Sequence, residues 1–113
     1  MDNNYQIKSR FWIEGKDGTF LGEGRVRLLQ AIEISGSISA AAKSLDMSYR
    51  KAWKMVDIMN AQAKEPLVVR QTGGKSGGGT LVTPQGTKAV NSYIAFKAKC
   101  NNFINETFQE YEF

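Results

Sequence analysis

The stretch that decides the fold runs from Ser37 to Val56 and reads SISAAAKSLDMSYRKAWKMV. It contains two helix-forming segments with a very short turn between them. Ser39 is placed to cap the first segment and Ser48 the second, because a serine hydroxyl can accept a hydrogen bond from a backbone N–H of the first turn. Two helices joined in this way form a helix-turn-helix, in which the exposed first turn of the second helix enters a DNA major groove.

The second helix of this pair has one apolar face and one basic face. Ala52, Val56 and Met59 recur at spacings of four and three, which predicts a buried stripe. The side chains turned toward solvent by this stripe are Tyr49, Arg50, Lys51 and Lys54. These four residues are candidate DNA contacts, and the family resemblance described below adds Ser48 to them. Arg50 is the candidate for reading a guanine edge, since arginine to guanine is the commonest specific contact.

The sequence before this stretch predicts one more helix and a hairpin. From Gly24 to Ser35 apolar residues recur at helical spacing, and Gly36 ends the pattern. Residues 6–13 and 19–21 read as strands, and the Asp17-Gly18 pair between them is a strong hairpin signal because both residues tolerate positive φ. The chain is therefore expected to begin with a β-hairpin that leads into a helix.

Two β-rich runs follow the helix-turn-helix, and a glycine-rich loop separates them. Residues 67–71 and 80–83 read as strands on either side of GGKSGGG at 73–79. A helix-turn-helix followed by such a hairpin is the winged form, and the loop is then the wing tip. Its glycines let the backbone approach a DNA phosphate. The candidate donors on the wing are Lys75, Ser76 and, at the base, Arg70.

The same loop ends like a nucleotide-binding signature, which gives an alternative interpretation. A P-loop needs Gly-x-x-x-x-Gly-Lys-Ser/Thr and a helix directly after the lysine. Counting back from Gly74, Val69 stands where the first glycine should be, and further glycines follow Ser76. Each of them costs about 1 kcal/mol in a helix relative to alanine. The loop is therefore expected to contact DNA phosphate and not a nucleotide.

A long helix is predicted from Pro84 to about Glu110. Thr83 can cap it, and proline suits the first turn, where its missing N–H does no harm. The apolar residues extend over about 27 positions, roughly 40 Å at 1.5 Å per residue, which is more than one small domain can cover. We therefore expect the distal part to pack against a second copy, with the acidic end, which includes Glu106 and Glu112, facing away from DNA.

The composition bounds the class of protein. The 113 residues fit one domain, and 42% hydrophobic with 23% charged residues is typical of a soluble protein. No apolar run is long enough to cross a bilayer and no secretory signal is visible, so a cytoplasmic location without membrane contact is expected. With no histidine and one cysteine, Cys100, the chain has no Ser-His-Asp or Cys-His catalysis, no histidine acid–base chemistry and no His-ligated zinc site. We expect no enzyme activity, no metal and no cofactor.

Two segments carry a resemblance to a known family. SGSISAAAKSLDMSYRKAWKMVDIMN and EPLVVRQTGGKSGGGTLVTPQG resemble the N-terminal DNA-binding domain of ModE, the molybdate-responsive regulator, which is distantly similar to LysR-type winged helices. The resemblance extends from about Gly22 to Tyr93. It implies a homodimer that binds a palindromic operator on double-stranded DNA, with residues 48–54 on the recognition helix and 73–79 on the wing.

Full-length members of this family carry C-terminal oxyanion-binding domains, whereas this sequence ends at Phe113. A short stand-alone form that does not itself bind molybdate is therefore expected. The expected fold is mainly α with small β-hairpins. It is a single winged helix-turn-helix domain over residues 1–113, with an N-terminal hairpin and a long C-terminal dimerisation helix. The alternative function is a protein-interaction module on a winged-helix scaffold without DNA binding.

Overall fold

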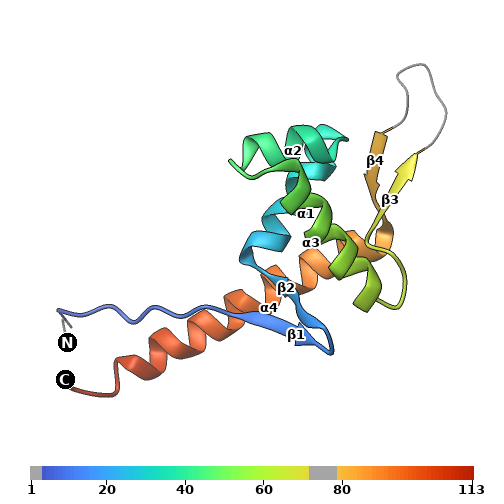
Figure 1. The fold of residues 1–113 in the computed structure, drawn as a ribbon. Helices are drawn as coiled ribbons and strands as arrows, with labels where there is room; N and C mark the ends of the chain where they lie inside the picture. The colour runs from blue at the N-terminus through green and yellow to red at the C-terminus, as the bar shows by residue number, and fades with distance from the viewer. Residues whose placement is uncertain (1–3, 72–78) are drawn as a thin grey trace.

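The computed structural model describes residues 4–71 and 79–113, and it has the predicted architecture (Figure 1). The elements in chain order are β1 (Trp12–Gly15), β2 (Gly18–Gly22), α1 (Glu23–Ser35), α2 (Ile38–Ser44), α3 (Tyr49–Gln62), β3 (Val68–Gln71), β4 (Gly79–Val82) and α4 (Pro84–Phe108). The strands form two antiparallel hairpins, β1 with β2 and β3 with β4. The winged helix-turn-helix, the hairpin before it and the long helix after it are thus confirmed.

One apolar core holds the helix-turn-helix together. The predicted stripe of α3 is buried, and it packs with apolar residues of α1 and α2. The largest fully buried side chains are Leu28, Leu29, Ile32, Met59, Leu67 and Val56. Burial of such a side chain contributes about 1.5–3 kcal/mol. The core therefore fixes α3 firmly and leaves its opposite face free.

Hydroxyl side chains cap three of the helices. Ser48 accepts a hydrogen bond from the N–H of Lys51 at 3.1 Å. For α2 the prediction was wrong by two residues, because the cap is Ser37, which accepts from the N–H of Ala40 at 3.1 Å, while Ser39 lies inside the helix. The reason is that Gly36 ends α1 with a left-handed φ of 70°, so the next residue is already extended where α2 begins.

Replacing Ser48 by alanine should lower the free energy of unfolding by about 1 kcal/mol, because the N–H of Lys51 loses its acceptor. The matched control is Ser39→Ala, which removes an exposed hydroxyl inside α2 and should change the free energy by less than about 0.5 kcal/mol. Urea denaturation of both variants measures the difference. Equal destabilisation by the two substitutions would contradict the assigned role of Ser48.

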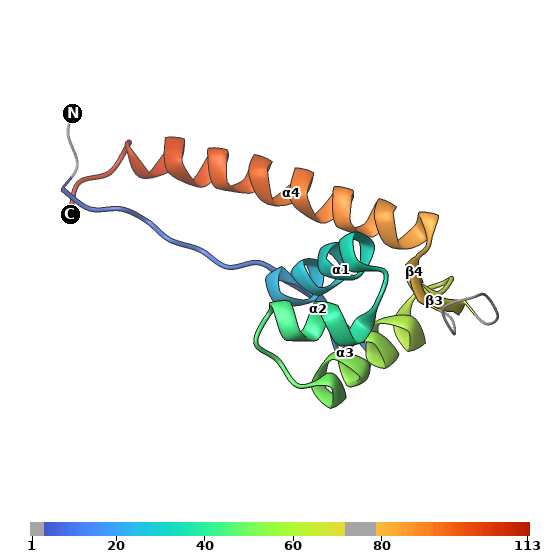
Figure 2. The same cartoon turned by 90° about the horizontal axis from the view of Figure 1, so that it is seen from above.

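The N-terminal strand is shorter than predicted. It begins at Trp12, and residues 4–11 form an extended arm that runs back along the distal half of α4 (Figure 2). The arm has no strand to pair with, because β2 is only five residues long and α1 begins directly after it. The arm therefore lies along the part of α4 that extends beyond the helix-turn-helix.

None of the described helices is long and apolar enough to span a bilayer.

Candidate nucleic-acid interface

The start of α3 presents the predicted recognition residues on one exposed surface. Ser48, Arg50, Lys51 and Lys54 are exposed, and half of the Tyr49 side chain is open to solvent. The segment from Tyr49 to Lys54 carries three basic residues and no acidic residue. The N-terminus of a helix is also the positive end of its dipole. The surface is therefore suited to a polyanion.

A tight turn of four residues, Leu45 to Ser48, connects α2 to α3. Asp46 has a left-handed φ of 53°, which aspartate tolerates better than most residues. The N–H of Met47 then donates to the carbonyl oxygen of Ala42 at 3.0 Å, which closes the turn back onto α2. The turn thus fixes where α3 begins and which way its first residues project.

An aromatic and basic stack joins the recognition helix to the base of the wing. The guanidinium carbon of Arg70, on β3, lies 4.2 Å from the ring centroid of Trp53, on α3. Tyr49 meets the same indole edge-on, with the ring centroids 6.2 Å apart. Trp53 is half-buried against the core. This geometry supports a packing role for Trp53.

The stack leaves Arg70 fixed but exposed. A cation over an indole face contributes about 0.5–1 kcal/mol at an exposed site, and the outer N–H groups of the guanidinium stay free to bind an anion. Arg70 and Trp53 are 17 positions apart, so no local pattern indicated their contact. The predicted wing residue and the predicted recognition helix therefore form one connected surface.

A double-mutant cycle can measure this contact. Combining Trp53→Leu with Arg70→Gln should give a coupling of about 0.5–1 kcal/mol in the free energy of unfolding, since each single variant already removes the stack. The control cycle pairs Trp53→Leu with Lys16→Gln, which changes an exposed lysine in the β1–β2 turn at the other end of α3, and should show coupling close to zero. Similar coupling in the two cycles would mean that the stack has no specific energy.

The wing hairpin is anchored to the helices at two points. The side chain of Asn60 on α3 accepts from the N–H of Leu67 at 2.8 Å and donates to the carbonyl oxygen of Val68 at 2.9 Å. The N–H of Thr80 donates to the carbonyl oxygen of Gly36 at 2.9 Å, which ties β4 to the end of α1. The wing base is therefore held against both α3 and α1.

The tip of the wing, with Lys75 and Ser76, lies outside the described residues. Its surroundings nevertheless bear on the nucleotide interpretation. The chain continues from the loop into strand β4, which pairs with β3 from Gly79 onward, whereas a P-loop is followed by a helix. This geometry counts against a nucleotide phosphate site. Within the described ranges, no group of acidic or cysteine side chains is placed to hold a metal ion.

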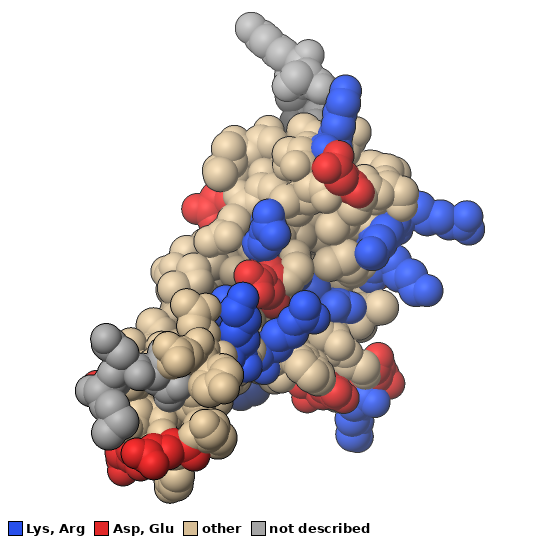
Figure 3. Space-filling model, turned by 90° about the vertical axis from the view of Figure 1, so that its left-hand side faces the viewer, with Lys and Arg blue, Asp and Glu red and all other residues tan. Residues whose placement is uncertain are grey.

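Charge is distributed unevenly along the molecule. In Figure 3 basic side chains lie across the middle and right of the face with single acidic side chains among them, and a group of acidic side chains without basic neighbours lies at the lower left, where α4 ends. The residues of that acidic end are Glu106, Glu110 and Glu112. Burial lowers the pKa of Arg25 on α1, but a guanidinium keeps its charge at neutral pH. The basic surface is thus separate from the acidic end of α4.

Several known proteins are similar in sequence to this chain over most of its length. The molybdenum transport protein ModE of Azotobacter vinelandii is 47% identical over 97 residues, which are 86% of this chain and 36% of that protein. The transcriptional regulator ModE of Haemophilus influenzae is 41% identical over 81 residues, which are 72% and 32% of the two chains. The chain thus spans about a third of the length of these relatives.

A third relative is described as a DNA-binding transcriptional dual regulator, ModE of Escherichia coli, and is 42% identical over 74 residues, or 66% of this chain and 28% of that protein. These similarities confirm the resemblance to ModE regulators. The profile of the bacterial regulatory helix-turn-helix proteins of the lysR family matches residues 24–87, from the second residue of α1 to the first turn of α4. The match covers more than half of the sequence, and the chain belongs to this family.

Proposed function

We propose that this chain is a transcriptional regulator that binds double-stranded DNA as a homodimer, with the start of α3 in the major groove and the wing on the phosphate backbone. The observation that carries the proposal is the basic first turn of α3 joined to the wing base by the Arg70 stack. Helix and wing are then presented together, as an element that enters a groove and an arm that touches the adjacent backbone.

Each residue of the surface has a proposed role. Arg50 reads a guanine edge, because its fork of N–H donors matches the two acceptors of guanine. The remaining residues of the helix, Ser48, Tyr49, Lys51 and Lys54, contact phosphates or flanking bases. On the wing, Arg70, Lys75 and Ser76 donate to phosphate oxygens. The nucleic-acid contacts are therefore divided between sequence reading by α3 and positioning by the wing.

The proposed dimer uses the exposed side of α4. Phe96 and Phe103 lie seven positions apart, which places them on the same side of the helix, and they are 61% and 68% exposed. Lys88 lies in the second turn of the helix, and Glu106, Glu110 and Glu112 lie at and beyond its end. Two copies packed antiparallel would bury the phenylalanines together and set Lys88 of each helix near the acidic end of the other.

The dimer proposal is tested by the mass of the protein in solution. Size-exclusion chromatography with light scattering should give twice the chain mass, and Phe103→Glu should give the chain mass, since it would place a carboxylate in the apolar contact. Ile13→Glu, an equally drastic change at an exposed residue of β1, is the control and should leave the dimer intact. A monomeric wild-type protein would rule the dimer out.

DNA binding is tested by fluorescence anisotropy of a labelled mixed-sequence duplex at low salt. The dimer should bind it, and two half-sites about 34 Å apart, or a multiple of that, should emerge from selection out of random duplexes if the dimer axis meets the DNA dyad. No affinity even at about 50 mM salt would instead favour the interaction module, because phosphate contacts are strongest at low salt.

We expect the protein in the cytoplasm, and we do not expect this chain to bind molybdate.

A further inference from the structure

The N-terminal segment touches the far end of the recognition helix. Gln62, the last residue of α3, accepts a hydrogen bond from the N–H of Asp17 and donates to the carbonyl oxygen of Thr19, each at 3.2 Å. Gly15 lies directly against the same side chain, and a Cβ at that position would overlap the Gln62 amide. The β1–β2 turn is therefore docked on the end of α3 at close range.

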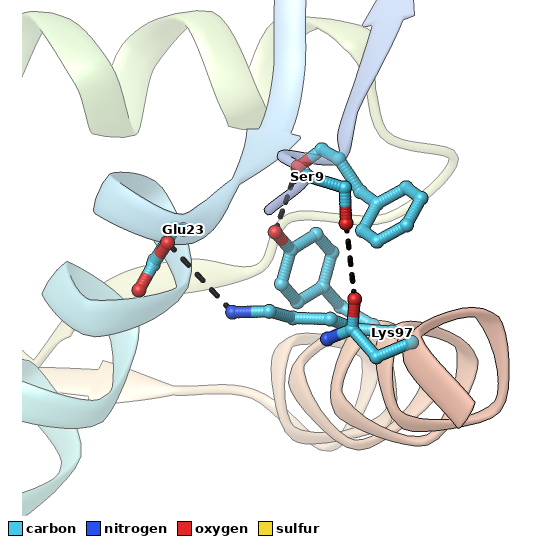
Figure 4. Close-up of polar contacts among 6 residues, drawn as sticks. Ser9, Glu23 and Lys97 are labelled. Carbon is cyan, nitrogen blue, oxygen red and sulfur yellow. Dashed lines mark hydrogen bonds and ion pairs between the residues drawn. The ribbon is translucent and has the colours of Figure 1, made fainter. Parts of the chain in front are cut away.

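The same segment is also fastened to the long helix. The hydroxyl of Tyr93 on α4 donates to the carbonyl oxygen of Phe11 at 2.7 Å, and Tyr93 is only 5% exposed. Slightly more than two helical turns beyond it, the hydroxyl of Ser9 donates to the side-chain oxygen of Asn101 at 3.1 Å. Figure 4 shows these contacts side by side where the arm crosses α4. Residues 9–19, called the strap from here on, thus connect α3 to α4.

An ion pair between α1 and α4 lies next to the strap. Lys97 on α4 approaches Glu23, the first residue of α1, with 3.7 Å between the charged atoms, as Figure 4 also shows. Both side chains are partly exposed, so the ion pair is weakly stabilising by itself. The ion pair is informative mainly through its position. It lies where β2 ends at Gly22 and α1 begins at Glu23. The strap, α1 and α4 therefore meet at one junction.

The direction of α4 has a large effect on the geometry of a dimer. From Pro84 to Cys100 a helix rises about 24 Å, so a tilt of about 10° at its base would move the pairing point by about 4 Å. One base pair of DNA advances by about 3.4 Å and turns by about 35°. A small change in the angle of α4 is therefore enough to misplace two recognition helices by one base pair.

We infer that the strap sets the distance between DNA half-sites by fixing α4 relative to α3, with Gln62 and Tyr93 as the positioning residues at its two ends. The inference rests on the proposed function, since it concerns the spacing that a DNA-bound dimer accepts. Neither residue touches DNA in this scheme. Gln62 lies at the opposite end of α3 from Arg50, and Tyr93 is a buried residue of α4 whose hydroxyl meets the arm.

The experiment compares spacing preference with half-site affinity. An operator is first selected with the wild-type protein, and duplexes are made with its half-sites at the selected spacing, one base pair closer and one base pair farther. Dissociation constants are then measured for wild type, Gln62→Met, Tyr93→Phe and the control Tyr111→Phe, which removes a hydroxyl beyond the end of α4. A duplex with a single half-site is included, and circular dichroism verifies that each variant is folded.

Wild type and Tyr111→Phe should prefer the selected spacing by at least about tenfold, the change expected when one of two linked contacts is misplaced. In Gln62→Met and Tyr93→Phe the preference should fall below about threefold, while affinity for the single half-site stays within about twofold of wild type. Gln62→Met acts at the opposite end of the strap. If the Tyr93→Phe protein does not fold, Gln62→Met therefore still tests the inference.

Three results would overturn the inference. The variants could keep the full spacing preference, the wild-type protein could have none, or the variants could lose affinity equally for every duplex including the single half-site. The last result would mean that the strap supports the domain as a whole and not the angle of α4. A wild-type protein with no affinity for any duplex would instead contradict the proposed function, so the two failures are distinguishable.

Discussion

Raising the salt concentration from about 50 to about 200 mM should weaken the binding of the dimer to a mixed-sequence duplex by about four orders of magnitude. Four basic residues of each protomer are proposed phosphate contacts, namely Lys51, Lys54, Arg70 and Lys75. If each neutralises one phosphate, the dimer releases counterions at about eight phosphates, and log K should fall against log salt with a slope near −7. Anisotropy titrations at several salt concentrations measure this slope.

Single charge removals sharpen the test. Lys54→Gln removes one phosphate contact per protomer, so the slope of the dimer should become shallower by about two. Lys16→Gln is the matched control, because Lys16 lies in the β1–β2 turn, which is below the helices and away from the wing in Figure 1. It should leave the slope unchanged. Equal slopes for the two variants would show that Lys54 on α3 does not contact DNA phosphate. A slope near zero for the wild-type protein would contradict the whole proposed DNA interface.

Gly86→Ala should destabilise the fold by about 2–3 kcal/mol, the cost of forcing an extra carbon into a filled site. Gly86 is buried in the first turn of α4, and a Cβ there would overlap the carbonyl oxygen of Leu67. That carbonyl already accepts from the N–H of Thr83 at 2.9 Å, so it cannot move away without breaking the junction between β4 and α4.

The same substitution in another helix provides the control. Gly24 lies in the first turn of α1, where a Cβ would meet no atom within 4 Å. Gly24→Ala should therefore stabilise the protein by about 0.5 kcal/mol, because alanine loses less backbone entropy in a helix. Thermal and urea denaturation at one fixed protein concentration compare the two, since a dimer's stability depends on concentration. Loss of stability in both variants would show that packing at Gly86 is not the cause.

The sequence predicted best those features that depend on neighbouring residues. The stripe on α3, the Ser48 cap and the Thr83-Pro84 start of α4 are local signals, and the structure confirms all three. The local pattern predicts Ser39 as the cap of α2, and Ser37, which is the cap in the structure, is also a serine with suitable spacing. The left-handed Gly36 determines which of the two serines caps α2. It ends α1, so Ser37 is already extended where α2 begins.

Long-range contacts could not be predicted in this way. Residues 6–11 have a strand-like pattern, but a strand needs a partner, and α1 begins before β2 can supply one. The contacts of Gln62 with the β1–β2 turn join residues 43 and 45 positions apart. Amide side chains carry no periodic signal, so nothing in the sequence singles them out. Gly86 marks a close approach by the Leu67 carbonyl, but a glycine in a helix does not predict one, since no atom lies within 4 Å of a Cβ built at Gly24.

The indole of Trp53 also gives the molecule an internal optical probe. The sequence has two tryptophans, and Trp12 lies on β1, away from the wing. With Trp12 replaced by phenylalanine, the remaining emission would come from a ring that has a guanidinium on its face and a tyrosine at its edge. Its intensity and wavelength depend on whether that guanidinium is present. Contact between wing and helix could therefore be followed in real time, on unlabelled protein, as an oligonucleotide arrives and leaves.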